Sequence, residues 1–216
     1  MLEIKPELSA AYPLNIARAR SIEGWMSDVE LLYLAFQAYQ AKDILEIGSW
    51  CGRSTRALVD NTQGHVVAVD TWAASGDEWQ KEFWSASMIL ESDWQFKYFT
   101  ENMSDVQDKL EVYRGLSTHA AMNYAALQRQ FDFIFIDASH DYKNVVLDIN
   151  AWKPLVRPGG VLAGHDYDPK RWPDVVRAVN ELLPEASNVV DHIWAIRIKG
   201  DENGNGSDSN TISDGL

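Results

Sequence analysis

The sequence predicts an α/β fold in which helices cover both faces of a mostly parallel sheet. Apolar strand candidates alternate with amphipathic helix candidates along most of the 216 residues. The stretch DILEIGSWCGRSTR, residues 43–56, joins a strand, a glycine turn and the start of a helix, which is how a Rossmann-like sheet usually opens. Two short strand candidates near the end, NVVD and IWAIRIK, pair as an antiparallel hairpin, because a parallel partner would need a crossover. We therefore expect a Rossmann-like three-layer sandwich that ends in a hairpin.

The length suits one domain. With 216 residues and 46% hydrophobic content, the chain is long enough for one full core, and two domains would be cramped. We expect a single domain over residues 1–199, in which 1–40 form an N-terminal helical cover and 71–95 a Trp-rich insertion. The last residues, DENGNGSDSNTISDGL, contain four acidic residues and no basic residue, so we expect 200–216 to be a disordered acidic tail.

Charge and cysteine usage exclude several classes of partner. The net charge of −13 argues against broad binding to nucleic acid or to anionic membranes, since both need a basic face. The sequence lacks the pattern of an export signal and any long apolar run. The single cysteine, Cys51, excludes an internal disulfide, so a cytoplasmic location is expected. The nine tryptophans are consistent with a homo-oligomer.

Two segments flank the glycine turn. A helix is predicted over SDVELLYLAFQAYQ, because a capping box from Ser27 to Glu30 precedes apolar residues at helical spacing. The Trp-rich insertion includes Trp79 and Trp84, whose rings could form a lid over an acceptor pocket or simply pack in the core.

The first two strand candidates favour an adenosine cofactor. Gly48 and Gly52 let a ligand approach the turn without meeting a Cβ. The strand HVVAVD ends on Asp70, about twenty residues beyond the turn, where a carboxylate can accept hydrogen bonds from both ribose hydroxyls. The dinucleotide fingerprint is incomplete, because Trp50 and Arg53 occupy its second and third glycine positions. NAD is therefore disfavoured. Asp70 alone does not distinguish NAD from other adenosine cofactors, because they share the ribose.

Ionisable residues follow the next two strands of the sheet. FDFIFID ends in Asp137, with His140 shortly after it, and VLAG is followed by His165 and Asp166. The carboxyl ends of neighbouring parallel strands meet at one edge, which is also the edge of the glycine turn. Carboxylates and imidazoles that converge there can bind a divalent cation that also holds a substrate hydroxyl.

The motif E-I-G-S-W-C-G-R-S, residues 46–54, resembles motif I of class I S-adenosylmethionine-dependent methyltransferases. It is similar in particular to the catechol O-methyltransferase branch and to bacterial enzymes that methylate sugars on natural products. The resemblance covers about residues 40–199 and implies a seven-stranded sheet. It also implies that Ser54 binds the cofactor carboxylate and that Ser117 contacts adenine. The full set of expected cofactor-binding residues is Glu46, Gly48, Ser49, Gly52, Ser54, Asp70, Ser117 and Asp137.

The resemblance also assigns roles at the strand ends. Asp137 matches a metal-binding Asp of the catechol-type enzymes, whereas His165 stands at their second Asp and Asp166 at their Asn. Mg²⁺ and Mn²⁺ are the metals we expect, and the imidazole shifts the preference away from Mg²⁺. Alternatively, His165 is a general base or a hydrogen-bond donor in a metal-free enzyme. His140 falls where the catechol enzymes carry the lysine that deprotonates the hydroxyl, and an imidazole can take that proton near neutral pH.

The predicted function is transfer of a methyl group from S-adenosylmethionine to a hydroxyl of a small molecule, catechol-like or sugar. An NAD-dependent oxidoreductase or sugar-nucleotide enzyme is an alternative that shares Asp70, but the chain lacks a Tyr-x-x-x-Lys pair suited to it. A catalytically inactive cofactor-binding protein is a third reading, which the intact set of ionisable residues at the strand ends opposes.

Overall fold

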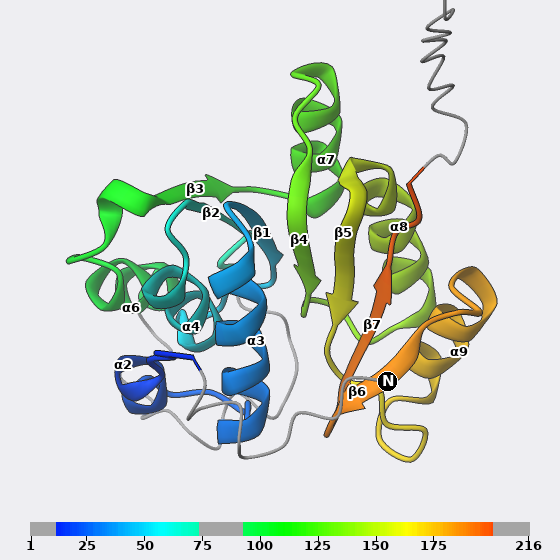
Figure 1. The fold of residues 1–216 in the computed structure, drawn as a ribbon, viewed down its shortest axis with the longest axis horizontal. Helices are drawn as coiled ribbons and strands as arrows, with labels where there is room; N and C mark the ends of the chain where they lie inside the picture. Colours follow the sequence, from blue (N-terminus) through cyan, green and yellow to red (C-terminus); the bar gives the residue numbers. More distant parts are fainter. Residues whose placement is uncertain (1–11, 74–92, 201–216) are drawn as a thin grey trace, which may run out of the picture.

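The computed structural model describes residues 12–73 and 93–200 and contains a seven-stranded sheet (Figure 1). The strand order is β3-β2-β1-β4-β5-β7-β6. Strands β1 to β5 pair in parallel, while β7 runs antiparallel to both β5 and β6. This confirms the predicted fold class, including the closing hairpin. The strands are β1 (Asp43–Ile47), β2 (His65–Asp70), β3 (Leu110–Arg114), β4 (Phe131–Ile136), β5 (Val156–Gly164), β6 (Ser187–Val190) and β7 (Ile193–Arg197).

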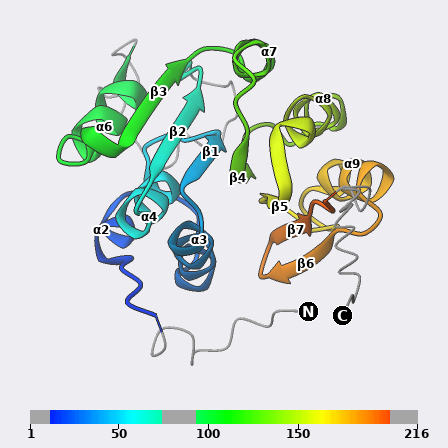
Figure 2. The ribbon, with the colours of Figure 1, turned by 45° about the horizontal axis from the view of Figure 1, so that its top comes forward.

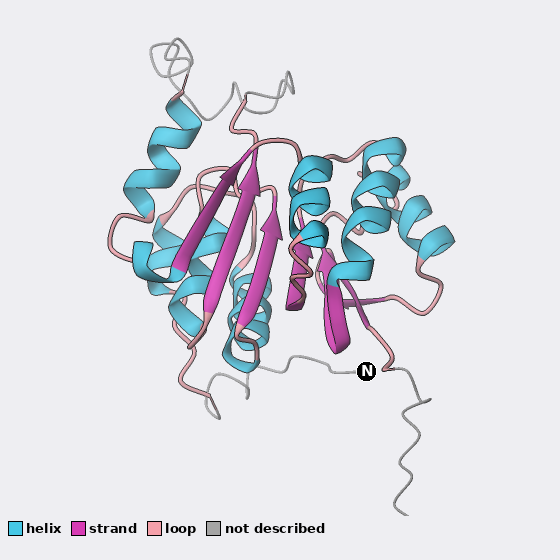
Figure 3. Ribbon diagram, turned by 90° about the horizontal axis from the view of Figure 1, so that it is seen from above, coloured by secondary structure: helices cyan, strands magenta, loops and turns pink. Residues whose placement is uncertain are grey.

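Helices cover the two faces of this sheet (Figures 2 and 3). One layer contains α2 (Ala17–Ser21), α3 (Asp28–Gln40) and α4 (Arg53–Asn61), with α6 (Trp94–Asn102) beside it. The opposite layer contains α7 (Ser117–Ala126), α8 (Tyr142–Trp152) and α9 (Pro173–Leu182). Two short 3₁₀ turns, η2 (Gln107–Lys109) and η3 (Lys153–Leu155), precede β3 and β5.

Alternate strand residues supply the two halves of the core. Ile44 of β1 packs in the cluster formed with α3 and α4, whereas Leu45 packs in the cluster formed with α7, α8 and α9. Phe133 and Ile134 of β4 divide in the same way, and both are almost fully buried. Successive side chains of a strand point to opposite faces, so a strand covered on both faces must be apolar throughout. The near-continuous apolar sequence of β4 therefore places it at the centre of the sheet.

The predicted capping box begins α3. The Ser27 hydroxyl accepts a hydrogen bond from the Glu30 amide at 3.3 Å, and the Glu30 carboxylate accepts one from the Ser27 amide at 2.8 Å. Such a cap contributes about 1 kcal/mol to stability, because it satisfies amides that have no partner within the helix. The helix start at Asp28 therefore follows from the sequence.

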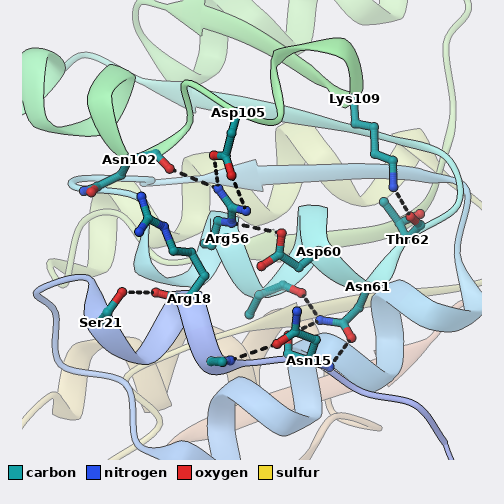
Figure 4. Close-up of polar contacts among 12 residues, drawn as sticks. Asn15, Arg18, Ser21, Arg56, Asp60, Asn61, Thr62, Asn102, Asp105 and Lys109 are labelled. Atoms are coloured by element: carbon teal, nitrogen blue, oxygen red, sulfur yellow. Dashed lines mark hydrogen bonds and ion pairs between the residues drawn. The ribbon is translucent and has the colours of Figure 1, made fainter.

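Polar contacts tie the N-terminal segment and the region after α6 to α4 (Figure 4). The Asn61 side chain donates to the Asn15 carbonyl and accepts from the Asn15 amide, both at 2.7 Å. Arg56 pairs with Asp60 at 2.9 Å and with Asp105 at 2.5 Å. Because α4 begins at the glycine turn, these contacts hold the helix that carries the turn.

Some predictions fall on residues that the structure does not describe. Trp79 and Trp84, the proposed lid, lie within 74–92, and the predicted acidic tail lies almost wholly within 201–216, so both are outside the described residues. Within the described ranges, every helix is too short or too polar to cross a bilayer.

Candidate active site

A cavity of about 810 Å³ lies at the carboxyl ends of the parallel strands. Residues from the ends of β1, β2, β4 and β5 line it, together with the start of α7 and the segment before α3. Among the predicted site residues, its lining includes Gly48, Ser49, Ser54, Asp70, Ser117, Asp137, His140, His165 and Asp166. Glu46 and Gly52 are not among the lining residues. The residues of the glycine turn and those after β4 and β5 thus lie at the same edge of the sheet, as the sequence predicts.

The glycines of the turn are required by packing. Gly48 has a φ of 86°, and a Cβ there would lie 1.9 Å from the Asp137 carbonyl oxygen. Gly52 has a φ of 93°, and its Cβ would lie 2.7 Å from the Met103 Cε beside α6. Both residues therefore let other parts of the chain approach the turn. For Gly52 the space is taken by the Met103 side chain, and the expected approach of a ligand stays a prediction.

The Asp70 carboxylate shapes the turn from the end of β2. Its Oδ2 accepts hydrogen bonds from the Ser49 amide at 2.9 Å and from the Trp50 amide at 2.8 Å. Its Oδ1 accepts from the Trp72 amide at 2.8 Å. A carboxylate has about four acceptor positions, so one remains for a ribose hydroxyl. The same side chain can therefore organise the turn and bind a nucleoside, which the sequence did not indicate.

Glu46 is fully buried beneath the turn. Its Oε2 accepts hydrogen bonds from the Ser49 hydroxyl at 2.6 Å and from the Thr55 hydroxyl. Its Oε1 has no partner among the described residues. Burial raises the pKa of Glu46 to about 7, although the hydroxyl groups around it oppose that rise. Glu46 thus supports the turn from below and is absent from the cavity lining, and its contact with the cofactor stays a prediction.

The Ser117 hydroxyl is engaged within the protein. It donates to the Asp148 carboxylate and accepts from the Trp152 indole nitrogen, which lies 2.8 Å away. Burial raises the pKa of Asp148 to about 6, against the effect of the Ser117 hydrogen bond. Ser117 lines the cavity, and these two partners leave its hydroxyl one lone pair that can still accept a hydrogen bond, so the expected contact with adenine stays a prediction.

The ionisable residues beyond β4 and β5 form one cluster. Ligand atoms of Asp137, His165 and Asp166 lie within 4.8 Å of one another. His165 Nδ1 is 3.3 Å from Asp166 Oδ1 and 3.6 Å from Asp137 Oδ1. Asp166 has a positive φ of 63°, a conformation that Asp tolerates better than most residues and that occurs often at functional sites. Two carboxylates and one imidazole form a donor set suited to a divalent transition metal such as Mn²⁺.

The carboxylates and imidazoles of this cluster shift one another's pKa values. Burial lowers the pKa of His165, but Asp137, Asp166 and Glu30 outweigh it and hold that pKa well above its ordinary value. Burial raises the pKa of Asp166, but hydrogen bonds with His140 and His165 hold it below its ordinary value. Burial raises the pKa of Asp137, and the nearby His165 opposes the rise. The cluster therefore holds protons in the absence of a cation, and a cation would compete with them.

His140 lies against two partners. Its Nε2 is 2.9 Å from Asp166 Oδ2, and its ring stacks on Trp172 with 3.8 Å between centroids and 20° between planes. Trp172 and Glu30, which contacts His165, are site residues that sequence reasoning missed. In the sequence, Glu30 can be recognised only as part of the capping box of a helix. No local pattern indicates that Trp172 stacks on a residue 32 positions earlier.

A seven-stranded sheet with an antiparallel hairpin end, a glycine turn after β1 and an acidic residue ending β2 defines the class I methyltransferase fold. The chain belongs to a methyltransferase-domain family, whose model matches residues 45–167. This match confirms the predicted S-adenosylmethionine-dependent methyltransferase and disfavours the oxidoreductase alternative.

Solved structures share the fold. The cofactor-bound protein Rv0187 from MTB is 22% identical, with a TM-score of 0.61 and coverage of 91% of each chain. An O-methyltransferase from Bacillus cereus, solved with SAH, is 22% identical, with a TM-score of 0.57 and coverage of 88% of this chain and 87% of that one. A calicheamicin methyltransferase is 15% identical, with a TM-score of 0.58 over 90% of this chain and 87% of that one.

One sequence relative is also similar. An uncharacterised protein of Acanthamoeba polyphaga mimivirus is 37% identical over 60 residues. The match spans only 27% of each chain.

Proposed function

We propose that this methyltransferase transfers the methyl group of S-adenosylmethionine to a hydroxyl of a small molecule, catechol-like or sugar, with the help of a divalent cation, Mn²⁺ or Mg²⁺. One observation carries the proposal. The glycine turn with Asp70 and the cluster of Asp137, His140, His165 and Asp166 line the same cavity. A cofactor bound at the glycine turn and Asp70 would therefore have its methyl group near the ionisable cluster.

The cofactor would be held by the turn after β1 and by the end of β2. Asp70 would accept a hydrogen bond from a ribose hydroxyl at its remaining acceptor position. Gly48 and Ser49 would line the methionine part, and Ser54 at the start of α4 would face its carboxylate, because amides at a helix start favour an anion. The buried Glu46 Oε1, which has no partner among the described residues, supports a polar group of the cofactor nearby.

The protein must then align the acceptor oxygen with the methyl carbon and take up the hydroxyl proton. His140 would accept that proton, and Asp166 would stabilise the imidazolium so formed. The bound cofactor would supply the methyl group, and its transfer would form the carbon–oxygen bond as the carbon–sulfur bond breaks, which would give the methylated acceptor and S-adenosylhomocysteine. Asp137, His165 and Asp166 would hold the cation, whose chemistry is to acidify the hydroxyl and to stabilise the developing oxyanion.

The aromatic side chains of the cavity favour a flat or ring-shaped acceptor. Trp25, Trp50 and Trp172 contribute to the lining. The Trp25 and Trp50 rings lie 4.4 Å apart between centroids. Indole rings stack on aromatic rings and on sugar faces, so catechols and sugars both suit this wall. The net charge of −13 supports a small-molecule partner over nucleic acid or an anionic membrane.

Calorimetric titration of the chelator-stripped protein tests the proposal. We expect micromolar binding of S-adenosylmethionine, no binding of NAD, and acceptor binding that requires Mn²⁺ or Mg²⁺. The His140→Ala variant should bind cofactor, cation and acceptor but lose turnover. Tight NAD binding without a response to S-adenosylmethionine would contradict the cofactor assignment. Full activity in EDTA would contradict the role of the cation.

A further inference from the structure

Glu30 lies in the first turn of α3, outside the residues 45–167 that match the family. Only 2% of this residue is exposed. Its carboxylate nevertheless contacts three parts of the chain. Oε2 accepts from the Ser27 amide at 2.8 Å, while Oε1 accepts from the His192 amide at 3.1 Å and lies 3.0 Å from His165 Nε2. Oε2 thus binds at the start of α3, and Oε1 binds at the end of β5 and at His192.

We infer that Glu30 is a positioning residue of the proposed cation site, which holds His165 so that its Nδ1 points at the Asp137 and Asp166 carboxylates. The inference rests on the proposed function, since it concerns the same site. Nδ1 already faces both carboxylates, because it lies 3.3 Å from Asp166 Oδ1 and 3.6 Å from Asp137 Oδ1.

The tautomer of His165 explains why a carboxylate is needed behind it. An imidazole binds a cation through a nitrogen lone pair, so its hydrogen must sit on the other nitrogen. In the cation-free cluster both ring nitrogens face carboxylates, and a cation would have to displace the hydrogen on Nδ1. The Glu30 carboxylate would then accept from Nε2–H of the neutral ring, so that the Nδ1 lone pair faces the two aspartates. A carboxylate that accepts from the outer nitrogen is the usual partner of a metal-binding histidine, and it also raises the basicity of the ring.

Hydrogen bonds join the start of α3, which carries Glu30, to the chain near His165. The Ser27 hydroxyl donates to Asp191 Oδ2 at 2.7 Å, and the adjacent His192 amide donates to Glu30. The start of α3 is therefore bonded to the turn between β6 and β7, next to the end of β5 in the sheet. A ligand held by rigid elements keeps its geometry better than one on a loop. A capping box alone would need neither the contact with His165 nor the one with His192.

Titration with Mn²⁺, followed by electron paramagnetic resonance, tests the inference on the full-length protein. We expect Glu30→Gln to bind Mn²⁺ about 10 to 100 times more weakly than the wild type, the usual effect of losing such a partner. The spin-echo modulation from an imidazole nitrogen on Mn²⁺ should be present in the wild type, reduced in Glu30→Gln and absent in His165→Ala. Asp28→Asn is the matched control, since it removes one negative charge from the same first turn of α3, on a side chain that pairs with Arg20. It should leave the Mn²⁺ affinity and the nitrogen modulation unchanged.

Two results would overturn the positioning role alone. The first is equal Mn²⁺ affinity and equal nitrogen modulation in wild type and Glu30→Gln. The second, which needs no variant and so holds even if Glu30→Gln fails to fold, is wild-type Mn²⁺ bound without any nitrogen signal. A wild-type protein that binds S-adenosylmethionine but no Mn²⁺ would overturn both this inference and the cation in the proposed function, and would leave the methyltransferase assignment intact.

Discussion

Replacement of Glu46 by Gln should change how the stability of this protein depends on pH. Glu46 is fully buried beneath the glycine turn, and burial raises its pKa from an ordinary 4.5 to about 7. Gln has the same shape as Glu but cannot ionise. The variant therefore resembles the protonated form of Glu46 at every pH.

The size and sign of the effect follow from proton linkage. Between pH 4.5 and 7 the unfolded chain loses the Glu46 proton while the folded chain keeps it. Folding stability therefore falls as the pH rises, by about 1.4 kcal/mol per pH unit. The contribution of Glu46 is fully present below pH 4.5 and lost by pH 8, which amounts to about 3 kcal/mol across that window. The Gln variant should lack this loss.

Urea unfolding of the cofactor-free protein at pH 5 and pH 8 measures the effect. At pH 5 the two proteins should have similar free energies of unfolding, and at pH 8 Glu46→Gln should be the more stable by up to about 3 kcal/mol. Glu101→Gln, at an exposed position on α6, controls for the loss of one negative charge and should show little of this change. If the difference between wild type and Glu46→Gln is the same at both pH values, Glu46 does not titrate in the folded state as argued.

Three further predictions concern the site. Asp70→Asn should weaken S-adenosylmethionine binding about 10 to 100-fold in calorimetry, because a charged hydrogen bond to the ribose becomes neutral; unchanged affinity would remove Asp70 from the cofactor site. Gly48→Ala should lower Tm far more than Gly159→Ala, since both have positive φ but only the first Cβ meets backbone, 1.9 Å from the Asp137 carbonyl oxygen. His140→Gln should lower kcat about 10² to 10⁴-fold without weakening cofactor binding; equal kcat would exclude it as the base.

Local sequence patterns were enough to predict the fold class and the edge of the sheet where the candidate site lies. Alternating strand and helix patterns depend on residues close together in the chain, so they can be identified without tertiary information. The glycine turn and Asp70 follow from the same local signals. Parallel pairing then brings the ends of β4 and β5 to that edge, which is why Asp137 and His165 could be expected to lie together.

The side chains that support the candidate site could be identified only from the packing of the helices on the sheet. Glu30 contacts a histidine 135 residues away, and Trp172 stacks on His140 from the segment before α9. The missing Cβ of Gly52 makes room for a methionine side chain, and Glu46 lies under the turn instead of in the cavity wall. Each of these contacts depends on how separate helices pack on the sheet. A single sequence carries no local signal for such contacts, because the packing joins residues that no spacing rule relates.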